Sequence, residues 1–289
     1  MQNSDAARPP VAIRIREVPP MAGLAWIRRA FRTFARRPGG FLGMFGLALL
    51  AMLLLRLVAP PIVMLMSLAF IPLLSLGFMG ATKAVQDDLP IHPGAFVAPL
   101  TSGAPRRRAQ LQIGLLYVVA AFACYIIGDR IDGGEATRWM IAMGTPTPQG
   151  TPPEPKPLSA AGTFSLLLQT CWIAFVSVPL WHAPALVHWG EQRAPQAMFS
   201  SIVALWRTRA AFIVHHLGWF AIGTLFMFVA ATLATVVGNP LLAVTLMVPA
   251  MWPLSTVFYI ALWYGFTDTF EIRPVDAEAA PVRSDDPAP

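Results

Sequence analysis

The sequence predicts an all-α polytopic membrane protein with six transmembrane helices in three hairpins, each preceded by a cytoplasmic interfacial segment. Of its 289 residues, 56% are hydrophobic and only 12% are charged, about half the charged fraction of a soluble domain. The apolar residues gather in runs, and about 20 such residues suffice to cross a bilayer as a helix. Most Lys and Arg residues lie at the ends of these runs, where the positive-inside rule places them.

The first segments are polar and basic. Residues 1–21 contain several prolines and predict a disordered cytoplasmic tail. Residues 22–37 carry apolar side chains on one helical face and arginines on the other, which predicts a basic amphipathic helix in the membrane interface. A helix packed against a globular core is the disfavoured alternative, because no soluble core follows. The side chains expected to meet lipid headgroups are Trp26, Arg28, Arg29, Arg32 and Arg36.

The apolar runs define one membrane domain, residues 22–272, followed by a second disordered tail at 273–289. Its expected spans cover about residues 42–58, 62–82, 111–128, 163–181, 212–237 and 241–266. Short turns at Ala59-Pro60-Pro61 and Gly238-Asn239-Pro240 join the first and last pairs. The middle pair is joined by an external loop, residues 129–161, whose alternating Pro and Thr residues predict an extended polyproline-like spacer.

The distribution of cations predicts the orientation. All but four of the 21 Lys and Arg residues fall in the two tails, in the first basic helix, or in the loops at 82–110 and 182–211. The other four, near the opposite ends of the spans, are Arg56, Arg130, Arg138 and Lys156. Both termini are therefore expected in the cytoplasm of a bacterium, with the chain in its inner membrane. Because the cations lie at the ends of the spans, the net charge of +6 does not indicate binding to nucleic acid.

A threefold repeat runs through the domain. The segments at 22–37, 93–108 and 195–209 each precede a hairpin, although Gly103 and Pro105 interrupt the middle one. The third repeats the aromatic–arginine pairing of the first, so Trp206 and Arg207 are also expected at the lipid interface. The second span of each hairpin contains a proline, and helix packing is the favoured explanation. These prolines are Pro72, Pro179 and Pro253.

The residues that carry chemistry are few. No serine-hydrolase, zinc-protease, phosphate-loop or dinucleotide fingerprint occurs, so the chain is expected to be no enzyme and to need no cofactor. Five polar residues near the cytoplasmic ends of the fourth and fifth spans could form a polar or proton-handling site. Zinc needs four ligands in tight geometry, so hydrogen-bonded interfacial histidines are favoured over a metal site. The five are His182, His188, Glu191, His215 and His216.

Residues 181–212 resemble a family of uncharacterised bacterial polytopic inner-membrane proteins. The motifs that carry the resemblance are Ala183-Pro184-Ala185-Leu186-Val187, Trp189, Phe199-Ser200 and Trp206-Arg207. The resemblance implies an inner-membrane location and a helical architecture, and it implies no activity. Where the family has an aromatic residue before Ala183, this chain has His182, which argues against a shared metal or catalytic role.

Besides a metal- or proton-handling role of the histidines, two functions remain open from the sequence. The favoured one is a non-enzymatic membrane protein whose basic amphipathic helices engage anionic lipid or a membrane-protein partner. The alternative is a small-molecule exporter or permease that uses the proline-kinked spans. That alternative requires a polar path, for which the spans offer only Gln169, Thr170, Thr224, Thr232, Ser255 and Thr256.

Overall fold

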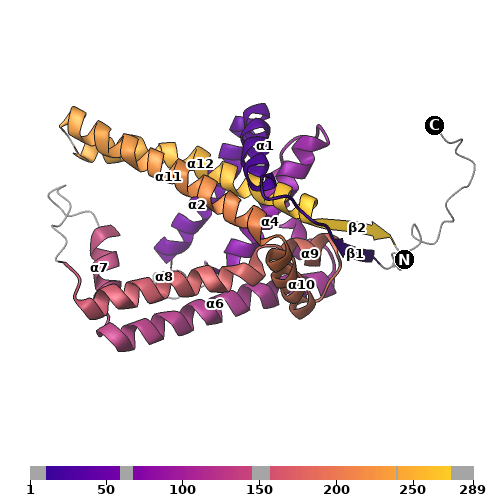
Figure 1. Cartoon of the computed structure of the whole chain (residues 1–289), viewed down its shortest axis with the longest axis horizontal. Coiled ribbons are helices and arrows are strands. Elements are labelled where there is room, and N and C mark those ends of the chain that lie inside the picture. The colour runs from indigo at the N-terminus through magenta and orange to yellow at the C-terminus, as the bar shows by residue number, and fades with distance from the viewer. Residues whose placement is uncertain (1–10, 59–67, 145–156, 239, 275–289) are drawn as a thin grey trace, which may run out of the picture.

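The computed structural model describes residues 11–58, 68–144, 157–238 and 240–274. Within them the chain is helical almost throughout, and Figure 1 shows the longest helices running roughly along the long axis of the molecule. The long elements are α1 (Ala22–Arg36), α2 (Pro38–Val58), α4 (Ile71–Gln86), α6 (Ala104–Asp132), α8 (Ala160–Leu180), α10 (Ala194–Arg207), α11 (Arg209–Val237) and α12 (Pro240–Thr269). The short ones are β1 (Val11–Ile15), η1 (Leu68–Phe70), η2 (Pro93–Phe96), α5 (Ala98–Thr101), α7 (Glu135–Gly144), α9 (Ala183–Trp189) and β2 (Phe270–Pro274).

The helical membrane architecture is confirmed. Among the described residues, five stretches are long and apolar enough to cross a bilayer. They are Pro38–Leu55, Leu68–Gln86, Ala104–Asp132, Ala160–Trp189 and Arg209–Val237. The third begins earlier than the expected 111, because Pro105 starts α6 in its first turn and the arginines after it are already helical.

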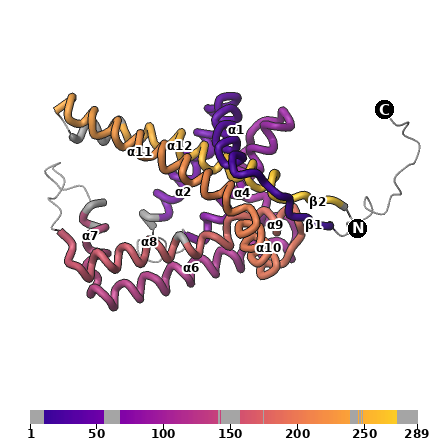
Figure 2. Tube along the Cα trace, viewed as in Figure 1, coloured from indigo at the N-terminus to yellow at the C-terminus, as the bar shows by residue number. Residues whose placement is uncertain are grey.

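The long helices form two arms. Helices α6 and α8 pack together, as do α11 and α12, while α2 and α4 pack on α12. In Figure 1 the α6–α8 and α11–α12 arms diverge toward the end that carries α7, and Figure 2 shows the same divergence along the trace. At the opposite end, α1, α9 and α10 gather around the bases of both arms.

The prediction that residues 1–21 are disordered is wrong for 11–15, and the all-helical class is incomplete. Strand β1 pairs antiparallel with β2, in a register that places Ala12 opposite Arg273 and Ile15 opposite Phe270. Ile13 and Ile15 pack against the core, because alternate residues of a strand share one face. This pair of strands, which we call the terminal ribbon, also includes residues 273 and 274 of the predicted second tail. Residues 1–10 and 275–289 lie outside the described residues.

The predicted loop at 129–161 contains helical structure within its described residues. Helix α6 continues to Asp132, and α7 forms where part of an extended spacer was expected. Both oxygens of the Asp132 carboxylate accept backbone N–H groups, from Gly134 at 2.8 Å and Ala136 at 2.9 Å, which caps α7. The Pro/Thr-rich stretch 145–156, the turn at 59–61, residues 62–67 of the second span and Asn239 lie outside the described residues.

The predicted middle interfacial segment, 93–108, is not one continuous helix. It divides into η2, α5 and the first turn of α6. Gly103 stands between the last two with φ of 100°, a conformation that glycine adopts without strain.

The terminal ribbon can be tested by cross-linking. Opposed Cβ atoms in an antiparallel pair lie about 4.5–5.5 Å apart, close to disulfide geometry. In a background with both native cysteines replaced by serine, we expect Ala12→Cys/Arg273→Cys to form an intramolecular disulfide under mild oxidation, detected by a gel shift. The control, Glu17→Cys/Arg273→Cys, is out of register and should stay reduced. Equal oxidation of both pairs would mean that the ends meet only by random collision.

Candidate functional site

Helix α1 is buried against the protein by its apolar face. Trp26 is 1% exposed and Ala30 is 0% exposed, and both pack into the main core. Where α1 crosses α11, a Cβ at Gly23 would collide with the Ala211 carbonyl oxygen and lie 2.6 Å from the backbone nitrogen of His215. Only glycine permits this approach. Trp26, predicted at the lipid surface, is therefore buried in the protein, because α11 and α12 cover this face of α1.

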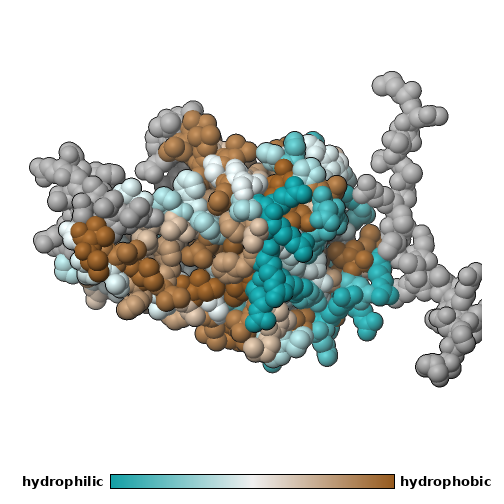
Figure 3. Space-filling model, turned by 90° about the horizontal axis from the view of Figure 1, so that it is seen from above, coloured by the Kyte–Doolittle hydropathy of each residue, from teal (hydrophilic) through white to brown (hydrophobic). Residues whose placement is uncertain are grey.

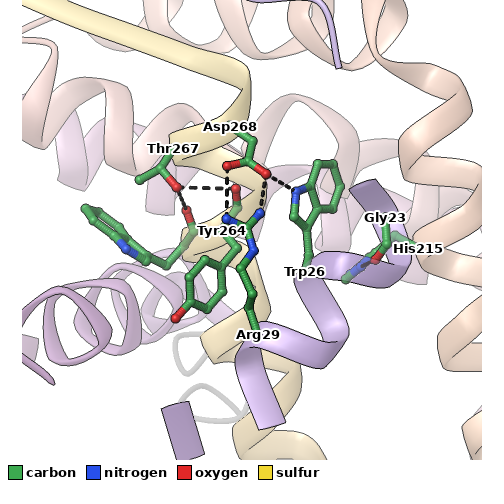
Figure 4. A network of polar contacts seen from close by, with 8 residues as sticks. Gly23, Trp26, Arg29, His215, Tyr264, Thr267 and Asp268 are labelled. Carbon is green, nitrogen blue, oxygen red and sulfur yellow. Dashed lines mark hydrogen bonds and ion pairs between the residues drawn. The ribbon is translucent and has the colours of Figure 1, made fainter. Parts of the chain in front are cut away.

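Asp268 is the polar partner that holds α1 on α12 (Figure 4). The Trp26 indole N–H donates to Asp268 Oδ2 at 2.8 Å, and the Arg29 guanidinium donates to both carboxylate oxygens, at 3.2 Å for Oδ1. The same guanidinium lies 4.6 Å from the Tyr264 ring centroid, a cation–π distance. The Tyr264 hydroxyl in turn hydrogen bonds with Thr33.

This network changes the role of Arg29. Its side chain is 37% exposed and the Asp268 carboxylate 31% exposed, so water screens the pair in part. Both carboxylate oxygens are nevertheless occupied by donors from α1. Arg29 thus binds Asp268 within the protein. Arg28, Arg32 and Arg36 are exposed on the opposite face, and their contact with lipid headgroups remains a prediction.

The histidines lie in an aromatic cluster rather than in a ligand set. His182 is 0% exposed, and its ring packs 5.5 Å from Phe212 and 5.3 Å from Phe270. Neither of its ring nitrogens has a hydrogen-bond partner among the described residues. His215 Nδ1 lies 3.3 Å from the Gly23 carbonyl oxygen, so this histidine belongs to the contact between α1 and α11.

The other predicted polar residues point elsewhere. His216 Nδ1 bonds to the carbonyl of Phe212, one turn earlier, at 2.7 Å. Glu191 forms an ion pair with Arg106 at the start of α6, while the His188 ring packs 5.0 Å from that of Trp189. The structure therefore does not bring the five residues into one site. Within the described part of the chain, no group of three or more His, Cys, Asp or Glu is placed to hold a metal ion.

Helix α10 is inverted relative to an ordinary amphipathic helix. Three of its large apolar residues face outward: Phe199 is 67% exposed, Ile202 45% and Trp206 71%, while Met198 and Leu205 pack against the core. Small residues face the protein, at Ala194, Ala197, Ser201 and Ala204. Arg209 lies 5.2 Å from the Trp206 ring centroid. We call Phe199, Ile202 and Trp206 the α10 stripe.

The α10 stripe lies at the boundary of two surfaces. Helix α10 ends at Arg207, and the apolar span α11 begins two residues later, at Arg209. Figure 3 shows polar residues gathered toward the end from which the terminal segments emerge, with mostly apolar residues over the rest of that face. The exposed Trp206 and Arg207 therefore stand next to the start of a span, where interfacial aromatic and basic residues concentrate.

Sequence reasoning missed the residues that dock α1. Asp268 could be seen only as the acidic residue that closes the last apolar run, and Tyr264 and Thr33 as residues within helices. A hydrophobic face predicts that something covers a helix. It does not predict whether lipid or protein covers it, and the Asp268 contact spans 242 residues of sequence.

Comparison with known proteins identifies a similar bacterial protein. No family model matches the chain, and no solved structure matches it. The sequence is 30% identical over 274 residues to a probable inner membrane protein of Burkholderia thailandensis, covering 93% of this chain and 98% of the relative. The match confirms the resemblance to bacterial inner-membrane proteins.

The Asp268 contact can be tested by Asp268→Asn. The substitution removes the charge that faces Arg29, and we expect the free energy of unfolding to fall by about 1–2 kcal/mol, discounted for partial exposure. Thermal unfolding in detergent, followed by circular dichroism, measures it. The control is Asp87→Asn, which removes an exposed carboxylate paired with Lys83 one turn away and should cost at most about 0.5 kcal/mol. Equal losses would contradict the role of Asp268.

The close approach at Gly23 can be tested by Gly23→Ala. The added methyl meets backbone atoms of α11 that cannot rotate away, so we expect a loss of about 1–3 kcal/mol. Gly39→Ala in α2, where a Cβ meets nothing within 4 Å, should instead gain up to about 1 kcal/mol of helix propensity. An unchanged or higher melting temperature for Gly23→Ala would show that α1 does not dock as described.

Proposed function

The chain belongs to the same family as the probable inner membrane protein of Burkholderia thailandensis, and from this premise we propose that it is a non-enzymatic component of the inner membrane that holds anionic lipid at its cytoplasmic face. The observation that carries the proposal is the α10 stripe. Phe199 and Trp206 are among the most exposed large apolar side chains of the described residues, and Arg209 lies over the Trp206 ring.

Six spans in three hairpins, with both termini in the cytoplasm, is the topology that we propose. Strand pairing of β1 with β2 supports an even number of crossings, because two paired terminal segments must lie on the same side of the membrane. Helix α12, with 30 residues, completes six together with the five membrane-length stretches. The distribution of Lys and Arg supports the cytoplasmic side for the ribbon.

Lipid contact by α10 follows from energetics. Burial of a large apolar side chain contributes about 1.5–3 kcal/mol, so the stripe would be costly to leave in water. Tryptophan favours the headgroup level, where its ring is apolar and its N–H is hydrated. Arg207 and Arg209 follow Trp206 in the sequence and complement the negative potential of the cytoplasmic leaflet.

The exporter alternative receives less support. The hydroxyls of Thr170, Thr232 and Thr256 each bond to a carbonyl one turn earlier in their own helix, at 2.8, 2.9 and 2.7 Å. Gln169 bonds to Ser165 in the same helix at 3.1 Å. Polar groups satisfied within one helix offer little to a passing solute.

Spin labels on α10 test the proposal. In a cysteine-free background reconstituted in nanodiscs of inner-membrane lipid, we expect labels at Phe199→Cys and Ile202→Cys to be relaxed by oxygen, which partitions into lipid. A label at Gln196→Cys, exposed on the polar flank of the same helix, should be relaxed by a water-soluble nickel chelate. Preference for nickel at all three positions would place the stripe in water and overturn the proposal.

A further inference from the structure

The terminal ribbon and α10 enclose an open cleft of about 810 Å³. Strand β1 supplies one wall, with Val203 and Arg207 of α10 opposite and Glu271 of β2 at the edge. The volume falls within the range of about 300–1,000 Å³ typical of small-ligand sites. Because the register of β1 on β2 is fixed over five residue pairs, this wall is a regular strand rather than an irregular coil.

The charges that line the cleft favour an anion. Glu271 is paired with Arg16, at 3.1 Å, and with Arg273, and the hydrogen bond from Arg16 lowers the pKa of Glu271 below its ordinary value. Arg14 and Arg207 are exposed and form no ion pair with other described residues. Although Glu17 also lines the cleft, two guanidinium groups remain free to bind there.

The apolar part of the lining points to a lipid rather than to a free ion. Ile13, Ile15 and Val203 contribute to the walls. Val203 lies one helical turn after Phe199, so it is a neighbour of the α10 stripe on the helix surface. The lining therefore continues from lipid-facing side chains to arginines. This is the order of groups along a phospholipid, from acyl chain to phosphate.

We propose that this cleft binds the headgroup phosphate of an anionic phospholipid. Arg14 and Arg207 donate to the phosphate oxygens, for which the planar guanidinium is well suited. Val203, next to the α10 stripe, contacts the glycerol and the first methylenes of the acyl chains. The inference rests on the proposed function, because the cleft reaches the headgroup layer only when α10 lies in the interface.

Lipid binding to the intact protein tests the site. The full chain in non-ionic detergent is titrated with dihexanoylphosphatidylglycerol, and bound lipids are counted by native mass spectrometry. We expect one saturable binding event that Arg14→Gln/Arg207→Gln weakens about tenfold, from the loss of two charged donors. The matched control, Arg107→Gln/Arg108→Gln, removes the same charge from exposed residues outside the cleft and should change affinity less than about twofold. Equal weakening by both variants would mean diffuse electrostatics and overturn the proposal.

Two competitors identify the ligand. Dihexanoylphosphatidylcholine, with the same chains and no net charge, should bind at least about tenfold more weakly. Inorganic phosphate at equal concentration should leave phosphatidylglycerol bound. Complete displacement by phosphate would make this a free-anion site and overturn the lipid assignment.

The measurements distinguish failure of the headgroup site from failure of the proposed lipid contact of α10. Formation of the Ala12–Arg273 cysteine cross-link in the Arg14→Gln/Arg207→Gln background shows that the ribbon is intact, so a loss of binding is not a loss of fold. Labels at Phe199 and Ile202 in lipid, with unchanged lipid binding by this variant, would remove the headgroup site and leave the proposed function standing. Labels in water would remove both.

Discussion

The contacts that the Asp268 carboxylate makes with α1 form the interaction on which the packing of α1, α11 and α12 depends. The carboxylate accepts the Trp26 indole N–H and the Arg29 guanidinium, and so ties α1 to the last turn of α12. Once α1 is held there, Gly23 allows its backbone to approach α11, and His215 closes the contact from the other side. Helix α1 therefore packs across α11 and α12. We call this packed arrangement of α1 on the two helices the clamp.

The clamp has a consequence for the rest of the surface. With Trp26, Ile27 and Ala30 of α1 turned inward, the more exposed large apolar side chains next to the span α11 are Phe199 and Trp206 of α10. That helix can expose Phe199 and Trp206 because its small residues fill the narrow space against the core. Strands β1 and β2 then bring the two terminal segments together, beside α10. The end of the molecule opposite α7 is thus a layer of α1, α10 and the ribbon, built on the bases of the two arms.

The sequence predicts the parts of this account that depend on local patterns. Apolar runs are long, uncharged and bounded by arginines, so the spans and the membrane class follow from composition. The period of α1 correctly predicts its apolar face, but the covering partner depends on Asp268, far along the chain. The strand at residues 11–15 is too short for its alternation to stand out. In α10, Phe199, Ile202 and Trp206 have the spacing of a core-facing stripe, and only the fold shows that small residues occupy the core side.

The central claim is that α10, and not the apolar face of α1, meets the lipid. The most direct measurement is paramagnetic broadening of the indole N–H resonances by a lipid that carries a nitroxide on its headgroup, with Trp26 and Trp206 assigned by substitution with phenylalanine. The account predicts strong broadening of Trp206 and a sharp, slowly exchanging Trp26 resonance. Strong broadening of Trp26, with Trp206 unaffected, would contradict it.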